Sequence, residues 1–145
     1  MSNIAKQFIG VWRLISCSQT DPDGQVSYPW GADAIGYIIY MSNQIMAVQI
    51  MRPNRALFIV DDFMLAQAEE CHTLPQNYNA YFGTYEIDEA KNTVIHHIQG
   101  HLFPNLVGKD NIRQYHFDGN RLLLTTVGSN IKRDMLWERV TAHTL

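Results

Sequence analysis

The sequence has little that would direct the chain to nucleic acid or to membranes. Its 145 residues carry 11 basic and 14 acidic side chains, a net charge of -3. They contain no run of Lys or Arg, so we expect neither nucleic acid nor an anionic membrane surface as a partner. No apolar stretch approaches the roughly 20 residues that a membrane-spanning helix needs, and residues 1–7 lack the basic and apolar regions of a secretory signal. We therefore expect a cytoplasmic protein without membrane insertion.

Cysteine is scarce, and the common motifs of cofactor-dependent catalysis are missing. Cys17 and Cys71 lie far apart and follow no metal-binding or redox spacing, so we expect two free thiols. The sequence also lacks a Gly-x-Ser-x-Gly element, a phosphate loop and a dinucleotide-binding fingerprint. It supports neither serine-triad hydrolysis nor nucleotide-dependent chemistry, and we predict no cofactor.

What the sequence does contain is a series of short, alternating segments separated by turn residues. Asp21-Pro22-Asp23-Gly24 is a strong turn signal, because Pro sets φ and Gly accepts positive φ. Strands at this spacing indicate an all-β barrel or sandwich, here as one domain over residues 1–145. The predicted strands are 11–18, 36–41, 44–51, 83–87, 93–99, 111–117, 121–127 and 134–140.

The two ends of the chain predict how this sheet closes. Trp12 follows Gly10 in the first strand, and Arg139 lies in the last, so the guanidinium can stack on the indole if these strands meet. Residues 2–9 are predicted to form a helical turn that plugs one end. Two further short helices, within 61–71 and 76–81, are predicted to lie across a barrel mouth.

Eight motifs support the same architecture. They are Gly10-Val11-Trp12-Arg13-Leu14, Tyr28-Pro29-Trp30-Gly31, Gly36-Tyr37-Ile38-Ile39-Tyr40, Met51-Arg52-Pro53-Asn54-Arg55, Tyr81-Phe82-Gly83-Thr84-Tyr85-Glu86-Ile87-Asp88, Val94-Ile95-His96-His97, Phe103-Pro104-Asn105-Leu106-Val107-Gly108 and Leu136-Trp137-Glu138-Arg139-Val140. In this order they resemble the lipocalin-like domain family, over nearly the whole chain. The resemblance implies a closed antiparallel calycin-type barrel with an internal cavity, which for a small barrel means about eight to ten strands. It implies no defined activity, because fold does not fix function.

Strand alternation selects the side chains that enter the barrel. His96 shares a face with Val94 and Ile98, while Arg113 shares one with Tyr115 and Phe117. An inward Arg is costly unless it is paired or binds an anion. We therefore interpret Arg113 as the anchor of a ligand carboxylate or enolate, with a structural ion pair to Glu86 or an outward orientation as the alternatives. Gln49 is expected to be a polar point in an otherwise apolar wall, on the face of Ile45, Ala47 and Met51.

The histidines permit two further interpretations. His96 and His97 are adjacent and point to opposite faces of their strand, so both cannot line one pocket without a bulge. His97 and His101 approach each other if the chain bends at Gly100, but a metal site needs a third ligand that spacing alone does not select. We predict no metal site. A neutral His96 in an apolar cavity can act as a general base.

Three functional hypotheses follow. The first is binding of a small, largely apolar molecule inside the barrel. The second is a cofactor-free cyclase or isomerase acting on a secondary metabolite, with His96 as the base and Arg113 or a tyrosine stabilising the anion. The third is a filled barrel that acts as an interaction module and forms a homodimer. The predicted ligand contacts are Tyr40, Gln49, Tyr85, His96, Arg113 and Tyr115, with His96 and Arg113 as the catalytic candidates.

Overall fold

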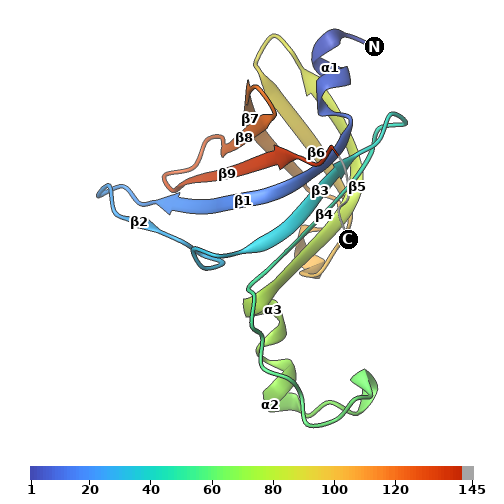
Figure 1. Ribbon diagram of the computed structural model, residues 1–145, viewed down its shortest axis with the longest axis vertical. Helices are drawn as coiled ribbons and strands as arrows, with labels where there is room; N and C mark the ends of the chain where they lie inside the picture. The colour runs from blue at the N-terminus through green and yellow to red at the C-terminus, as the bar shows by residue number, and fades with distance from the viewer. Residues whose placement is uncertain (142–145) are drawn as a thin grey trace.

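The computed structural model describes residues 1–141, so residues 142–145 of the predicted domain lie outside the described part (Figure 1). Nine strands and five short helical segments follow each other along the described chain. They are α1 (Asn3–Phe8), β1 (Gly10–Thr20), β2 (Val26–Ser27), β3 (Ile35–Tyr40), β4 (Ile45–Met51), η1 (Phe63–Leu65), α2 (Ala68–Cys71), α3 (Leu74–Asn77), β5 (Tyr78–Asp88), β6 (Thr93–His101), η2 (Pro104–Leu106), β7 (Asp110–Asp118), β8 (Arg121–Thr126) and β9 (Lys132–Arg139).

The strands form one antiparallel sheet that closes on itself. From β3 to β9 each strand pairs with the next one in sequence, and β1 pairs with both β3 and β9. The closing register runs from Trp12 opposite Arg139 to Thr20 opposite Lys132. The barrel thus has eight strands, with the two-residue β2 attached to the end of β1. This confirms the closed antiparallel barrel predicted from the chain ends.

Side chains alternate between the barrel interior and solvent, as a strand period of two requires. On β6, Val94, His96 and Ile98 are buried, as predicted. On β4 the predicted face is wrong. Met46, Val48 and Ile50 point inward, and Gln49 is exposed on the outer face. Both faces of this strand are largely apolar, so alternation alone did not identify the inner one.

A bulge in β1 changes which side chains enter the barrel. Trp12 and Leu14 point inward, but the register shifts between Leu14 and Ser16. A bulge places two residues opposite one and so reverses the alternation beyond it. Cys17, rather than Ser16, is consequently buried on the inner side of the strand.

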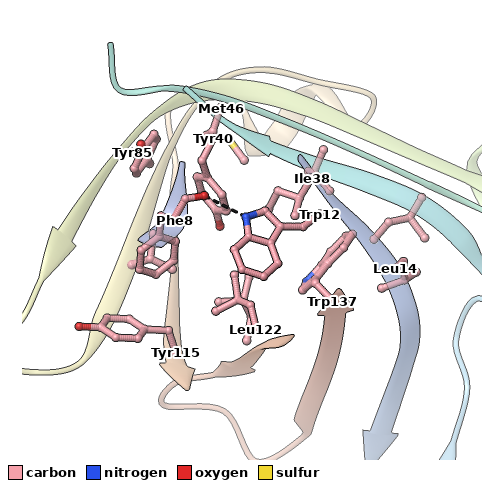
Figure 2. Packing of buried hydrophobic residues seen from close by; sticks show 14 of the residues in the cluster. Phe8, Trp12, Leu14, Ile38, Tyr40, Met46, Tyr85, Tyr115, Leu122 and Trp137 are labelled. Atoms are coloured by element: carbon pink, nitrogen blue, oxygen red, sulfur yellow. Dashed lines mark hydrogen bonds between the residues drawn. The ribbon is translucent and has the colours of Figure 1, made fainter. Parts of the chain in front are cut away.

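Helix α1 closes one end of the barrel. Ser2 caps the helix through its side chain, which accepts a hydrogen bond from the Ala5 amide at 3.1 Å. Phe8, in the last turn, has no solvent exposure. Its ring makes edge-to-face contacts with Tyr40, at 5.2 Å between centroids, and with Tyr115, at 5.1 Å (Figure 2). The helix therefore acts as a plug, as predicted for residues 2–9.

The aromatic plug is tied to the closing strands. The indole N–H of Trp12 donates a hydrogen bond to the carbonyl of Phe8 at 2.9 Å (Figure 2). The guanidinium of Arg139 lies 4.2 Å from the centre of a Trp12 ring and donates to the carbonyls of Gln7 and Ile9. The predicted pairing of Trp12 with Arg139 is confirmed, and the arginine also holds the C-terminal end of α1.

The segment between β4 and β5, residues 52–77, does not cover the mouth of the barrel. It runs away from the sheet with α2 and α3 along it (Figure 1). Five of its apolar side chains are largely exposed: Leu57, Ile59, Phe63, Met64 and Leu65. The prediction of helices lying across the mouth was wrong, because this segment contributes no side chain to the buried core. No helix among residues 1–141 is long and apolar enough to cross a membrane.

The predicted helix at 76–81 is also shorter than expected. Helix α3 ends at Asn77, and β5 begins at Tyr78, opposite Met51 of β4. Extending β5 back to this residue lets Tyr81 pair with His101 across β6. Long-range strand pairing thus overrides the local helical preference, and it turns Tyr81 into a residue of the barrel wall.

Candidate functional site

A cavity of about 180 Å³ lies inside the barrel. Residues of all eight barrel strands, of the loop between β2 and β3 and of η2 line it. The lining residues are Cys17, Trp30, Ile38, Val48, Ile50, Asn79, Tyr81, His96, His101, Leu106, Asn111, Arg113, Leu124, Arg133, Met135 and Trp137. Most of the wall is apolar or aromatic, while the polar groups come mainly from β5, β6, β7 and β9. An apolar pocket with a few convergent polar groups is the usual form of a small-molecule site.

His96 is the centre of the polar part of the cavity. Its Nε2 lies 2.7 Å from the hydroxyl of Tyr40, and its Nδ1 lies 2.9 Å from the hydroxyl of Tyr81. Tyr81 also accepts a hydrogen bond from the amide of Asn111 at 3.3 Å. Four strands, β3, β5, β6 and β7, therefore hold one chain of polar groups across the barrel interior.

The numbers of donors and acceptors in this chain of polar groups determine which group donates to which. A neutral imidazole donates from one nitrogen and accepts at the other. Tyr40 is 1% exposed and does not line the cavity, and among residues 1–141 its hydroxyl has only His96 as a partner. If Tyr40 accepted from His96, its own proton would have no acceptor, at a cost of about 1–3 kcal/mol. Tyr40 therefore donates to Nε2, and the Nδ1–H of His96 donates to Tyr81.

Burial keeps His96 uncharged. Desolvation, together with the positive charge of Arg113, lowers the pKa of His96 to about 3. Both ring nitrogens already have hydrogen-bond partners. A base needs a free nitrogen and a pKa near the working pH, so this arrangement favours a structural and orienting role for His96. Its predicted role as a catalytic base stays a prediction.

Arg113 lines the cavity, as the alternation on its strand predicted. Its Nη1 donates to the carbonyl of Ile112 at 3.0 Å, and no carboxylate pairs with it in the described chain. Burial lowers the pKa of Arg113, although an arginine stays charged near neutrality. Glu86, the predicted partner, instead lies outside the barrel, 3.7 Å from His97. The expected neutralising pair is therefore absent from residues 1–141.

Arg133 is a second guanidinium in the wall that sequence reasoning missed. Its Nη2 donates to the side chain of Gln19 at 2.9 Å, and its Nε is buried without a hydrogen-bond partner among the described residues. Strand β9 begins at Lys132, two residues before the predicted strand at 134–140. Extending the inward alternation of Met135 and Trp137 back by one step would have identified Arg133.

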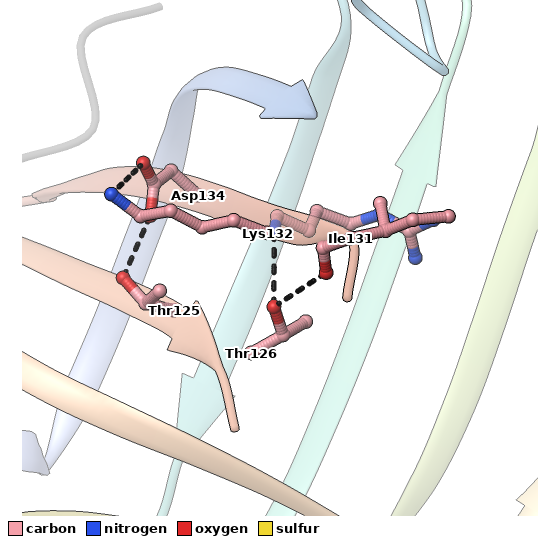
Figure 3. A network of polar contacts seen from close by, with 6 residues as sticks. Thr125, Thr126, Ile131, Lys132 and Asp134 are labelled. Atoms are coloured by element: carbon pink, nitrogen blue, oxygen red, sulfur yellow. Dashed lines mark hydrogen bonds and ion pairs between the residues drawn. The ribbon is translucent and has the colours of Figure 1, made fainter. Parts of the chain in front are cut away.

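The hairpin between β8 and β9 holds Arg133 in place. The hydroxyl of Thr126 accepts from the backbone amide of Arg133 at 3.0 Å and donates to the carbonyl of Ile131 at 3.2 Å (Figure 3). The carboxylate of Asp134 accepts from Thr125 of β8 at 2.8 Å and lies 3.4 Å from Lys132 (Figure 3). The cavity lining contains no acidic side chain.

Four of the six predicted ligand contacts do not line this cavity. Tyr85 donates to the carbonyl of Met41 at 2.8 Å, and Tyr115 packs against Phe8 at the closed end (Figure 2). Gln49 lies on the outer face and accepts a hydrogen bond from Tyr78 at 2.5 Å. The fourth, Tyr40, is buried behind His96. His96 and Arg113 are thus the predicted contacts that line the cavity.

His97 and His101, the two histidines considered as metal ligands, lie in different surroundings. His97 points outward, as predicted, and its Nδ1 lies 2.7 Å from Asp110. The hydrogen bond to Asp110 is the main cause that raises the pKa of His97. His101 stacks on Tyr81, with 5.2 Å between ring centroids. Within residues 1–141 there is no group of three or more His, Cys, Asp or Glu that could hold a metal ion.

Comparisons with known proteins found one curated relative and solved structures that are similar to this chain. A carrier protein for 4'-hydroxy-3'-methoxypropiophenone from Aspergillus oryzae is 30% identical over 88 residues, which are 57% of this chain and 79% of the relative. A solved fatty acid transporter, REP1-NXSQ, superimposes with a TM-score of 0.45 and 13% identity, over 95% of this chain and 99% of its own. Fatty-acid-binding protein 1 of Echinococcus granulosus superimposes with a TM-score of 0.44 and 10% identity, over 94% of this chain and 99% of its own.

The family model for the lipocalin-like domain matches residues 9–143. This match includes every strand of the barrel and every residue that lines the cavity. It agrees with the resemblance carried by the eight sequence motifs. The chain belongs to the lipocalin-like domain family.

Proposed function

We infer that this protein binds a small, largely apolar molecule inside its barrel, with a polar end of the ligand at Arg113. The observation that carries this proposal is a cavity whose wall is mostly apolar and whose charged groups are two guanidiniums without an acidic neighbour in the lining. A buried charge is costly unless something pairs with it. A ligand carboxylate, phenolate or enolate would supply that partner for Arg113.

The size of the cavity indicates a compact ligand. Its volume of about 180 Å³ lies below the roughly 300–1,000 Å³ of sites for drug-sized molecules. The fungal relative is a carrier for 4'-hydroxy-3'-methoxypropiophenone, a small aromatic ketone whose phenol is acidified by conjugation with the carbonyl group. A molecule of this kind has an apolar body and can present an oxyanion, so it is a suitable first probe.

The alternatives receive less support. Catalysis by His96 requires a nitrogen that its two tyrosine partners already occupy. The hypothesis of a filled barrel is supported less, because a cavity of about 180 Å³ lies in the interior. Formation of a homodimer and a cytoplasmic location stay predictions.

Isothermal titration calorimetry with three probes tests the proposal. The probes are 4'-hydroxy-3'-methoxypropiophenone, 3-phenylpropanoate and propylbenzene. We expect the wild-type protein to bind at least one of them with one site per chain. Absence of binding for all three would contradict the proposal.

A matched pair of variants on β8 locates the site. Leu124 points into the cavity, while Leu123 points to the outer surface. Leu124→Phe fills part of the cavity and should abolish binding, whereas Leu123→Phe should not affect it. Thermal unfolding of both variants verifies that they fold. Equal binding by two folded variants would place the ligand outside the barrel.

A further inference from the structure

The direction of the polar chain around His96 has a consequence for the ligand. Tyr81 accepts hydrogen bonds from the Nδ1–H of His96 and from Asn111, so both lone pairs of its oxygen are occupied. Its own proton is then free to point elsewhere. Since Tyr81 lines the cavity, the remaining direction for this proton is the space that a ligand would fill.

The geometry points to Tyr81 as a hydrogen-bond donor to an oxyanion of the bound molecule, beside Arg113, with the buried Tyr40–His96 pair fixing the direction of that donor. This inference rests on the proposed function and narrows it to ligands whose inner end is an acceptor without a proton of its own, such as a carboxylate or a phenolate. Tyr40 is then a positioning residue, because it touches His96 and not the cavity.

Other groups in the wall support the same ligand chemistry. The indole N–H of Trp137 and the Nε–H of Arg133 are buried donors without a hydrogen-bond partner among residues 1–141. Arg113 supplies further N–H groups. Unpaired donors from β7 and β9 thus surround the space next to Tyr81. An alcohol or an amine would bring protons of its own to this region, whereas an oxyanion brings lone pairs.

An NMR measurement on the ligand-free protein tests which groups donate in the chain of hydrogen bonds from Tyr40 through His96 to Tyr81. Long-range proton–nitrogen NMR correlation distinguishes the two neutral forms of an imidazole, and comparison with His96→Gln assigns the signals of His96 among the six histidines. We expect a proton on Nδ1 and an unprotonated Nε2. A proton on Nε2 would mean that Tyr81 donates to His96, and this would overturn the inference.

Calorimetry with two matched probes tests the oxyanion. Propylbenzene and 3-phenylpropanoate share an apolar body, but only the second carries a carboxylate. Tyr81→Phe should weaken the binding of 3-phenylpropanoate by about 10- to 100-fold, the value of a hydrogen bond to a charged group. It should leave the affinity for propylbenzene unchanged. Tyr85→Phe is the control, because its hydroxyl donates to Met41 outside the cavity. Replacing 3-phenylpropanoate by 4'-hydroxy-3'-methoxypropiophenone distinguishes a carboxylate from a phenolate as the preferred ligand.

The outcomes separate this inference from the proposed function. If the wild-type protein binds propylbenzene but neither oxyanion, the apolar site exists and the inference is wrong. If Tyr81→Phe weakens the binding of both matched probes equally, the residue shapes the cavity without donating a hydrogen bond to the ligand, and the inference is again wrong. Absence of binding for every probe would contradict the proposed function itself, while the NMR result still decides the direction of the chain.

Discussion

Acidification should destabilise this protein through His96. The residue is 1% exposed and accepts a hydrogen bond at Nε2, and its pKa falls from 6.5 to about 3 on folding. Between these two values the unfolded chain binds a proton that the native state does not. Stability therefore rises with pH in this window and is lost as the pH falls from 6.5 towards 3.

The size of the effect follows from the shift. One pKa unit corresponds to about 1.4 kcal/mol, so lowering the pH from 6.5 to 5 should remove about 2 kcal/mol through His96 alone. The complete loss at pH 3 would be on the order of 5 kcal/mol. Typical domains have about 5–15 kcal/mol of stability in total. A single buried histidine can therefore account for a large part of acid unfolding here.

Urea denaturation at pH 6.5, 6.0, 5.5 and 5.0 measures this slope, in a range where carboxylates of ordinary pKa stay mostly ionised. His96→Gln removes the titrating group, so its free energy of unfolding should depend much less on pH. His97→Gln is the matched control. The pKa of His97 is raised, so its contribution is fully present below pH 6.5 and is lost only as the pH rises through the raised pKa. Equal slopes for the wild-type protein and His96→Gln would refute the reasoning.

Three further predictions concern the fold, each tested by urea denaturation. Phe8→Ala should lower the free energy of unfolding by about 3–5 kcal/mol, because Phe8 fills the closed end of the barrel. Phe63→Ala, at an exposed position, should change it by less than about 0.5 kcal/mol. Similar losses for the two variants would contradict the role of α1 as a plug. Arg139→Lys should cost about 1–2 kcal/mol, since a lysine cannot both cover Trp12 and donate to two carbonyls. Gly83→Ala should cost about 1–3 kcal/mol, because its Cβ would lie 1.9 Å from a backbone oxygen of β6. An unchanged unfolding midpoint would count against either of the last two.

The sequence predicts the barrel well because its signals are the alternation within each strand and matching residues in the first and last strands. A strand that starts with Gly10-Val11-Trp12 and a last strand with Arg139 need only antiparallel pairing to bring the two residues together. The inward position of His96 follows from regular alternation on a strand without a bulge before it. The inward position of Cys17 does not follow from regular alternation, because the bulge in β1 adds one residue that composition does not reveal.

The site is less accessible to sequence reasoning because it depends on distant pairings. Tyr81 follows a segment with local helical preference, and its place in the wall results from pairing with β4 and β6. Gln49 lies on a strand whose two faces are both apolar, so alternation gave no means of choosing between them. The order of donors from Tyr40 to Tyr81 requires knowing that Tyr40 has no second acceptor, which only a three-dimensional arrangement can show.

The contact between β1 and β9 also constrains how the chain reaches its native state. The hydrogen bond from Arg139 to the carbonyl of Ile9 joins positions 130 residues apart. Ring closure over such a distance carries a large entropic cost and gives slow folding. During synthesis on the ribosome, the inner face of the first strand would therefore stay exposed, or be covered by other contacts, until the last strand had been made.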